Sequence, residues 1–289
     1  MSDLYYVAPE NASALRQGRG VLTGAEARHL AKVMRGKPGD EVALFDGSGC
    51  EFRGRILTVA RDVVELEILE SREDDREPDV AATVLLALPK GDRQKWAIEK
   101  LCELGVRRVV PLESRRSDVK VDEGVRERLE RHALEASKQC GRLRLMSITP
   151  ALAVSELPAL AELLDARLKD ADALSPQARR LRERFDGFGL FDEFRPGDDV
   201  VRVVAHPRSD GDFGQTGFQE LVRSRLARAP RGVLAAIGPA GGFSAEEVQS
   251  AVECGWIPLD LGRQVYRVET AALVTAALFL HLGRVDTKQ

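Results

Sequence analysis

Three short stretches of the sequence place glycine, proline and charged side chains directly after a predicted buried strand. They are Ala205–Arg208, Ile237–Ser244 and Leu261–Thr270. In Ile237–Ser244, three glycines allow the backbone to approach a ligand closely. Open parallel sheets bind ligands at the carboxyl ends of their strands, so we expect these loops to line one crevice. The spacing matches neither the GxGxxG dinucleotide pattern nor a P-loop, and it predicts neither ligand.

Simpler interpretations of the three loops stand beside this one. A ligand role is favoured over an ordinary turn for 237–244, because three glycines and a proline exceed what a turn needs. For 261–270, a ligand site and a surface ion-pair patch are equally compatible with two arginines and a glutamate. A lone histidine such as His206 more often has a structural role. We expect Thr270 or Glu269 to cap the helix that follows.

Basic residues gather at predicted loops and element ends, although the chain has 43 Lys and Arg against 46 Asp and Glu, a net charge of −3. This balance excludes a chain that holds nucleic acid through its overall field alone. The local clusters nevertheless suit phosphate contacts, against the alternative of scattered solubilising charge. The clusters are His29, Lys32, Arg35 and Lys37; Lys90, Arg93 and Lys95; Arg115, Arg116 and Lys120; and Lys138, Arg142 and Arg144.

The elements that position these residues fall into two predicted domains. Short strands over 41–69, in which apolar and polar residues alternate, predict a small β-barrel or sandwich within residues 1–74. A charged run at 71–79 predicts a linker. Residues 80–289 alternate strands and helices, typical of an α/β domain with a parallel sheet. Its predicted strands are 84–88, 107–112, 200–205, 232–237 and 257–261, and its predicted helices are 95–104, 123–139, 244–254 and 270–282. A charged insertion near 165–196, with a helix at 176–184, is expected to be a solvated surface.

Composition narrows the class of protein further. The four cysteines, Cys50, Cys102, Cys140 and Cys254, lie far apart and show no zinc spacing, so no metal site is expected. The longest apolar runs are too short to span a bilayer, which needs about 20 residues. We therefore expect a cytoplasmic protein with no membrane contact.

Seven stretches together resemble the RsmE family of SPOUT-superfamily methyltransferases, over nearly the whole chain except the insertion. They are HLAKVMRGKPGD (29–40) with LFDGSG (44–49), KGDRQKWAIEKLCELGV (90–106), PLESRRSDVK (111–120), EASKQCGRLR (135–144), AHPRS (205–209), IGPAGGFSAEEV (237–248) and LGRQVYRVETAAL (261–273). The chain departs from the family pattern at Ala240, where a glutamate is usual. It departs again at Arg263 and Gln264, which replace Pro-Arg, and at Val268, which replaces threonine.

This resemblance implies a fold, a reaction and a set of partners. The fold would be an N-terminal PUA-like β-barrel plus a C-terminal SPOUT α/β domain with a trefoil knot. The activity would be methyl transfer from S-adenosyl-L-methionine to N3 of a uridine in 16S ribosomal RNA of the 30S subunit, by a homodimer. The implied cofactor-binding residues are Ala205, His206, Ile237, Gly238, Pro239, Gly241, Gly242, Leu261, Gly262, Val265, Tyr266, Arg267 and Thr270. The expected RNA-binding residues are His29, Arg35, Lys90, Arg93, Lys95, Arg115, Arg116, Arg142 and Arg144.

For the chemistry we expect Arg267 to stabilise the uracil anion and Glu269 to orient it, as the catalytic pair. An arginine cannot itself be the base at neutral pH, and the sequence names no base. Two alternatives stay open: a SPOUT enzyme acting on another RNA such as tRNA, and a non-catalytic RNA-binding assembly factor. A nucleotide-dependent oxidoreductase is disfavoured, because Pro89-Lys90-Gly91-Asp92 stands where its glycine fingerprint would be.

Overall fold

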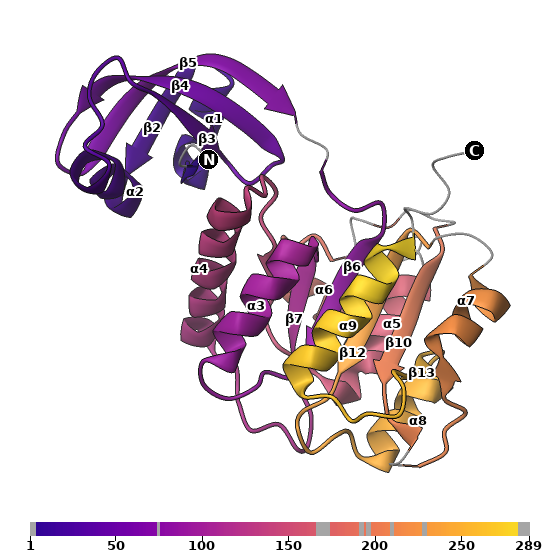
Figure 1. The fold of residues 1–289 in the computed structure, drawn as a ribbon. Helices are drawn as coiled ribbons and strands as arrows, with labels where there is room; N and C mark the ends of the chain where they lie inside the picture. Colours follow the sequence, from indigo (N-terminus) through magenta and orange to yellow (C-terminus); the bar gives the residue numbers. More distant parts are fainter. Residues whose placement is uncertain are drawn as a thin grey trace. The chain divides into compact units, whose positions relative to one another are not determined.

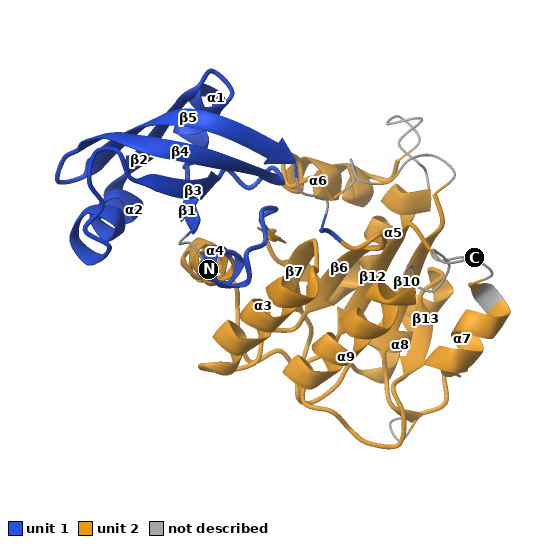
Figure 2. Cartoon of the chain, turned by 45° about the horizontal axis from the view of Figure 1, so that its top comes forward, with its two compact units in different colours: residues 1–77, 134–145 blue, residues 78–133, 146–289 orange. Residues whose placement is uncertain are grey.

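The computed structural model describes residues 4–73, 76–165, 174–190, 194, 198–208, 211–226 and 230–282. Contacts divide the chain into two compact units, coloured separately in Figure 2. Unit 1 comprises residues 1–77 and 134–145, and unit 2 comprises 78–133 and 146–289. Within the described ranges, no helix is long and apolar enough to cross a membrane, and no three His, Cys, Asp or Glu side chains gather as metal ligands would.

Unit 1 is built on a curled five-stranded sheet. Its elements are β1 (Leu4–Tyr6), α1 (Pro9–Leu15), β2 (Arg19–Thr23), α2 (Gly24–Arg28), the π-helical turn η1 (His29–Val33), β3 (Glu41–Phe45), β4 (Cys50–Val59) and β5 (Val63–Glu73). The strand order is β1-β3-β4-β5-β2, with β1 and β3 parallel and the other pairs antiparallel. Alternate residues of β4, including Phe52 and Ile56, are buried in the core, as the period of two predicts.

Two features of unit 1 differ from the sequence-based expectation. β5 extends to Glu73, which pairs with Cys50, so the strand runs into the stretch expected as linker. Residues 134–145, expected in the second domain, group with unit 1. Within that unit, Lys138 Nζ lies 2.8 Å from Glu26 Oε1, and Arg142 donates two hydrogen bonds of 2.8 and 2.7 Å to Glu77.

Unit 2 is an α/β domain with a parallel sheet (Figure 1). Its elements are β6 (Ala81–Leu86), α3 (Arg93–Leu104), β7 (Arg108–Glu113), α4 (Glu123–Cys140, whose last turns belong to unit 1), β8 (Ser147–Ile148), β9 (Leu152–Ala153), the 3-10 turn η2 (Val154–Glu156), α5 (Leu157–Asp165), α6 (Pro176–Arg184), β10 (Val200–Ala205), β11 (Thr216–Gly217), α7 (Phe218–Arg225), β12 (Gly232–Ile237), α8 (Ala245–Glu253), β13 (Ile257–Asp260) and α9 (Val268–Leu280).

The strand order in unit 2 is β11-β13-β10-β12-β6-β7-β8, with β9 also paired to β7. Figure 1 shows α3 and α9 side by side on one face of this sheet, and α5 on the other. Burial on both faces explains why β6 and β12 are apolar without alternation. The sequence predicted the first of these strands at 84–88, whereas β6 spans 81–86. The order places β13, β10 and β12 next to one another, and their carboxyl ends therefore share one edge.

The charged insertion has a buried face that the expectation of a solvated surface missed. Its helix α6 begins and ends where predicted, with Ser175 as N-cap. Leu181 and Phe185 pack into a hydrophobic core cluster of unit 2. The buried Arg108 donates hydrogen bonds to the carbonyls of Phe188 (3.2 Å) and Gly189 (2.9 Å). Residues 166–173, 191–193 and 195–197 of this stretch lie outside the described residues.

Candidate functional site

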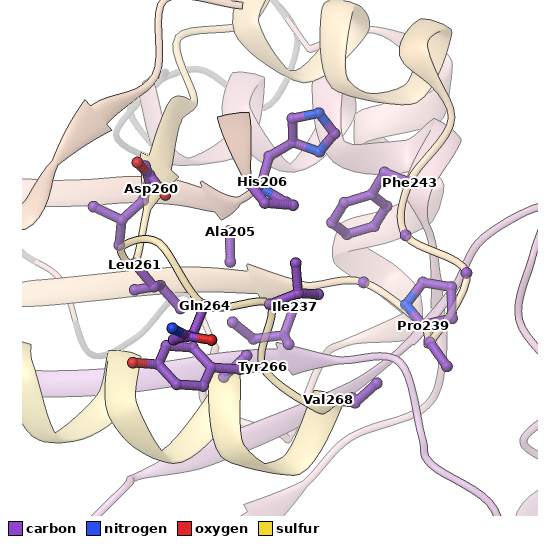
Figure 3. Close-up of a pocket in the computed structure, with 18 of the residues that line it drawn as sticks. Ala205, His206, Ile237, Pro239, Phe243, Asp260, Leu261, Gln264, Tyr266 and Val268 are labelled. Carbon is purple, nitrogen blue, oxygen red and sulfur yellow. The ribbon is translucent and has the colours of Figure 1, made fainter. Parts of the chain in front are cut away.

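The three strand-end loops meet around one cavity of about 330 Å³ in unit 2 (Figure 3). Its walls come from the carboxyl ends of β10, β12 and β13, the loops that follow them, and the first turn of α9. The lining residues are Ala205, His206, Pro207, Ile237, Gly238, Pro239, Ala240, Gly241, Gly242, Phe243, Leu259, Asp260, Leu261, Gly262, Gln264, Val265, Tyr266, Val268 and Ala271. A volume of this size suits a small-molecule ligand rather than a macromolecule.

The loop after β12 is held as a tight turn. Gly242 N–H donates to the carbonyl of Pro239 at 2.8 Å, and Gly242 adopts a positive φ of 67°. Ser244 then caps α8: its Oγ accepts from Glu247 N–H, and Glu247 Oε2 accepts from Ser244 N–H at 2.8 Å. This reciprocal pair confirms the capping box expected from the sequence. The glycine loop is therefore anchored to the first turn of a stable helix.

A carboxylate and an imidazole add polar groups to the cavity wall. Asp260 Oδ1 accepts from Gly262 N–H at 3.1 Å, and Asp260 Oδ2 lies 3.3 Å from Arg208 Nε. The first contact orders the loop after β13, and the second joins this loop's first residues to the loop after β10. His206 is buried, its backbone N–H donates to Leu259 O, and its ring packs edge-on against Phe213. The cavity thus combines apolar walls, one acidic side chain and backbone groups.

Eleven of the thirteen expected cofactor-binding residues line the cavity; Arg267 and Thr270 are not among its lining residues. The helix starts earlier than predicted, because α9 begins at Val268 with Arg267 as its N-cap. The expectation that Thr270 or Glu269 caps this helix is therefore wrong. Val268 and Ala271 face the cavity instead, three residues apart on one helical face.

The two expected catalytic residues lie in different surroundings. Arg267 is exposed at the N-terminus of α9. Glu269 is buried, and its Oε1 lies 3.8 Å from the guanidinium of Arg93 on α3. Glu269 Oε2 is buried without a hydrogen-bond partner among the residues that the structure describes. The carboxylate thus joins α9 to α3, and it is not part of the cavity lining.

Sequence reasoning missed several lining residues. They are Pro207, Ala240, Phe243, Leu259, Asp260, Gln264, Val268 and Ala271. Pro207, Ala240 and Gln264 lie inside the stretches singled out, and Asp260 is the last but one residue of the predicted strand 257–261. Those positions could therefore have identified them. Phe243 approaches Gly238 so closely that a Cβ there would lie 3.1 Å from its ring, a packing detail with no sequence signal.

The nine expected RNA contacts are spread over both units. In unit 1, Arg35 is exposed with a positive φ of 57°, and His29 packs against Tyr5. Arg142 is instead buried against Glu77, with 8% of its side chain exposed, an arrangement that favours a structural role. Arg144 pairs with Ser48 in a β-bridge.

In unit 2, each of the five expected RNA contacts has a partner within the chain. Lys90 pairs with Asp118, Arg93 with Glu269, and Lys95 with Glu99. Arg115 pairs with Glu246, and Arg116 donates to the carbonyl of Gly241. The first three pairs leave each cation at least half exposed. These side chains therefore remain accessible to solvent.

Sequence comparison identifies a family along most of the chain. Residues 76–175 and 189–280 match the RNA methyltransferase domain family, and residues 22–69 match the RNA methyltransferase PUA domain. A relative from Bacillus subtilis, Ribosomal RNA small subunit methyltransferase E, is 28% identical over 258 residues, covering 87% of this chain and 86% of its own.

Solved structures resemble the chain over residues of both units. A structure described as a probable rRNA-methyltransferase from Porphyromonas gingivalis is 27% identical, has a TM-score of 0.71 and covers 98% of each chain. Ribosomal RNA small subunit methyltransferase E from Neisseria gonorrhoeae, bound to S-adenosyl methionine, has a TM-score of 0.69 at 24% identity and covers 96% of each chain. The second likeness concerns the fold alone.

Proposed function

The chain belongs to the RsmE-type RNA methyltransferase family, and from this we propose that it transfers a methyl group from S-adenosyl-L-methionine to N3 of a uridine in 16S ribosomal RNA of the 30S subunit. The observation that carries the proposal is the meeting of three separate chain segments, 205–207, 237–243 and 259–268, around one cavity. The ribosomal RNA methyltransferase relative from Bacillus subtilis matches over most of both chains and supports the substrate class. A ribosomal substrate implies a cytoplasmic enzyme.

The cavity fits the proposed cofactor. Ile237, Leu261 and Val268 offer apolar contact for a purine ring, and the carboxylate of Asp260 offers an acceptor for hydroxyl or ammonium groups. The loop glycines leave backbone groups accessible, and a side chain at Gly262 would point into open space but would strain a φ of 118°. When bound, S-adenosyl-L-methionine supplies a methyl group already activated by attachment to a positively charged sulfur.

The protein's own task is then to orient the uracil and favour its anion. Uracil N3 carries a proton that must be lost as the nitrogen bonds the methyl carbon. A guanidinium beside the base stabilises the developing negative charge, and Arg267 is our candidate because it stands exposed next to cavity-lining Tyr266 and Val268. We assign Glu269 a positioning role, because its carboxylate faces Arg93 from α9. Holding the reactants in line can supply about 7–11 kcal/mol of the barrier reduction.

Cations that reach the surface provide the proposed grip on RNA phosphates. In unit 1 we propose the exposed Arg35 and the half-buried Arg144, and in unit 2 the exposed Lys90, Arg93 and Lys95. The finer features of the fold belong to the same proposal: a PUA-like barrel in unit 1, a trefoil knot in unit 2, and a homodimer. Among the described residues of unit 2, Trp96, Val265 and Tyr266 are large apolar side chains with 44%, 74% and 38% of their surface exposed. Their exposure is compatible with burial against a second copy.

The test is direct detection of the product. The protein is incubated with methyl-deuterated cofactor and either 30S subunits, free 16S RNA or transfer RNA, and nucleosides are analysed by mass spectrometry. We expect deuterated 3-methyluridine in the small-subunit RNA. Ala271→Leu, which fills the cavity, abolishes the product, whereas Ala277→Leu on the same helix, away from the lining residues, retains it. Methylation of another atom or only of transfer RNA would refute the assignment.

A further inference from the structure

The loop that follows β7 is fastened to the loop that follows β12. Arg116 donates a hydrogen bond of 2.7 Å from its guanidinium to the carbonyl oxygen of Gly241. One residue earlier, the backbone N–H of Arg115 donates to Glu247 Oε1 at 2.9 Å. The 115–116 segment therefore meets the glycine loop and the capping box of α8 at the same time. Sequence reasoning expected both arginines to bind phosphate.

These bonds fix one peptide unit of the cavity wall at both ends. The peptide between Gly241 and Gly242 has its carbonyl held by Arg116 and its N–H held by Pro239 O at 2.8 Å. Gly241 has no side chain, and a Cβ built on it would lie 3.5 Å from Arg116 Cδ, so the aliphatic part of the arginine also packs against the glycine. A flexible glycine turn would otherwise lose this order, because glycine has the largest backbone entropy of any residue.

The two arginines differ in what their side chains hold. Among the described residues, the side chain of Arg115 pairs only with Glu246, at 3.4 Å, and 71% and 72% of these two side chains are exposed. Such a surface pair contributes little. The side chain of Arg116 holds a carbonyl of the cavity wall. Arg115 and Arg116 are thus both exposed arginines, but their side chains hold different partners.

We propose that Arg116 is a positioning residue for the cofactor loop: it fixes the Gly241–Gly242 peptide in the conformation that receives S-adenosyl-L-methionine, and it is not one of the residues that grip RNA. This inference rests on the proposed function for the identity of the cofactor. The claim about loop order holds for the cofactor-free protein as well, so it has an independent readout.

The experiment compares Arg116→Ala, Arg116→Lys and Arg115→Ala. Loss of a charge-assisted hydrogen bond predicts that Arg116→Ala raises the dissociation constant and the KM for S-adenosyl-L-methionine about tenfold, while kcat at saturating cofactor stays within about twofold. Arg116→Lys restores part of the affinity, because its ammonium can still donate one hydrogen bond. Arg115→Ala leaves the cofactor dissociation constant unchanged. Without cofactor, hydrogen exchange at the Gly242 amide accelerates in Arg116→Ala only.

Three outcomes overturn the inference. In the first, Arg116→Ala weakens RNA binding and reduces its salt dependence by about one phosphate contact while cofactor affinity stays intact. In the second, Arg115→Ala and Arg116→Ala weaken cofactor binding equally. In the third, exchange at Gly242 does not change. If the wild-type protein binds no S-adenosyl-L-methionine, the proposed function fails, whereas the exchange measurement still decides the role of Arg116.

Discussion

Removing the hydroxyl of Ser244 should destabilise unit 2 without touching its core. Ser244 is the N-cap of α8, and its Oγ accepts from Glu247 N–H at 3.3 Å while donating to Glu246 Oε2 at 2.7 Å. In Ser244→Ala both bonds are lost, but Glu247 still accepts from the backbone N–H of residue 244. Half of the reciprocal cap therefore survives. The variant isolates the contribution of one side-chain oxygen.

The expected cost follows from the residues involved. Replacing a serine N-cap by alanine costs about 1 kcal/mol, with an upper limit of about 2. We expect the lower value, because Glu247 continues to satisfy one amide and the lost Oγ–N distance of 3.3 Å is long. For a unit of this size, about 1 kcal/mol lowers the unfolding midpoint by roughly 2–4 °C.

The difference in the free energy of unfolding between wild type and Ser244→Ala should also depend on pH. The hydroxyl of Ser244 is the main cause that holds the pKa of Glu246 below its ordinary value of 4.5. A carboxylate with a lowered folded-state pKa contributes stability that is present above the unfolded pKa and is lost as pH falls through the folded pKa. The gap between wild type and Ser244→Ala is therefore complete near neutral pH and narrows below about pH 4.5.

The two tryptophans make the assay specific. The sequence has two tryptophans, Trp96 and Trp256, and both lie in unit 2. Tryptophan fluorescence in urea therefore follows the unfolding of that unit. Ser250→Ala is the matched control, since it makes the same change inside α8, where alanine is the better helix former. Equal midpoints for Ser244→Ala and Ser250→Ala would refute the reasoning, and so would a gap that widens in acid.

Two further changes probe contacts that the fold requires. Lys138→Met leaves Glu26 without its 2.8 Å partner at a position where the two side chains are 13% and 15% exposed, and it should cost about 2–3 kcal/mol, somewhat less than breaking a fully buried pair. Hydrogen exchange in residues 134–145 measures this, and adding Glu26→Gln should recover part of the loss. Gly105→Ala forces a side chain into a φ of 89° and to 2.7 Å from Pro78, and should cost well over 1–2 kcal/mol. The control Gly187→Ala has a similar φ of 79° but open space, and it should show the backbone cost alone in urea unfolding.

Helices and strands whose ends are marked by residues in the local sequence were predictable from the sequence. β10, β12 and α6 begin and end at the predicted residues. β12 is a buried apolar run, β10 is rich in valine, and α6 carries a proline and an N-cap at its start, so these limits have signals in the local sequence. α9 lacks such a signal: its first turn contains Val268, Glu269 and Thr270 after a non-helical Arg267. This helix packs against α3, a contact with a distant segment that is not visible in the sequence of one segment alone.

The roles of charged residues were the least predictable part of the site. Lys138 and Arg142 stand in a basic cluster in the sequence, yet both are held by carboxylates more than 60 residues away in the chain. An arginine that binds phosphate and one that binds a distant glutamate have the same sequence signature. The two kinds of residue differ only in whether the folded chain supplies a carboxylate partner. Nothing in the sequence around Glu77 and Glu26 shows that they pair with Arg142 and Lys138.

Strand order explains why the cavity and the Arg116 contact occur together. All strands of the main sheet run parallel, so the loops after β7, β6, β12, β10 and β13 leave from the same edge in that spatial order. Neighbouring strands lie about 4.8 Å apart, so the end of β7 stands about 10 Å from the end of β12, across β6. A loop residue with a long side chain can span that distance, whereas a short one cannot. The edge that brings three loops around the cavity therefore also places the basic loop after β7 within reach of their backbone. A cation at this position is consequently close enough to order the cavity wall before it meets any RNA.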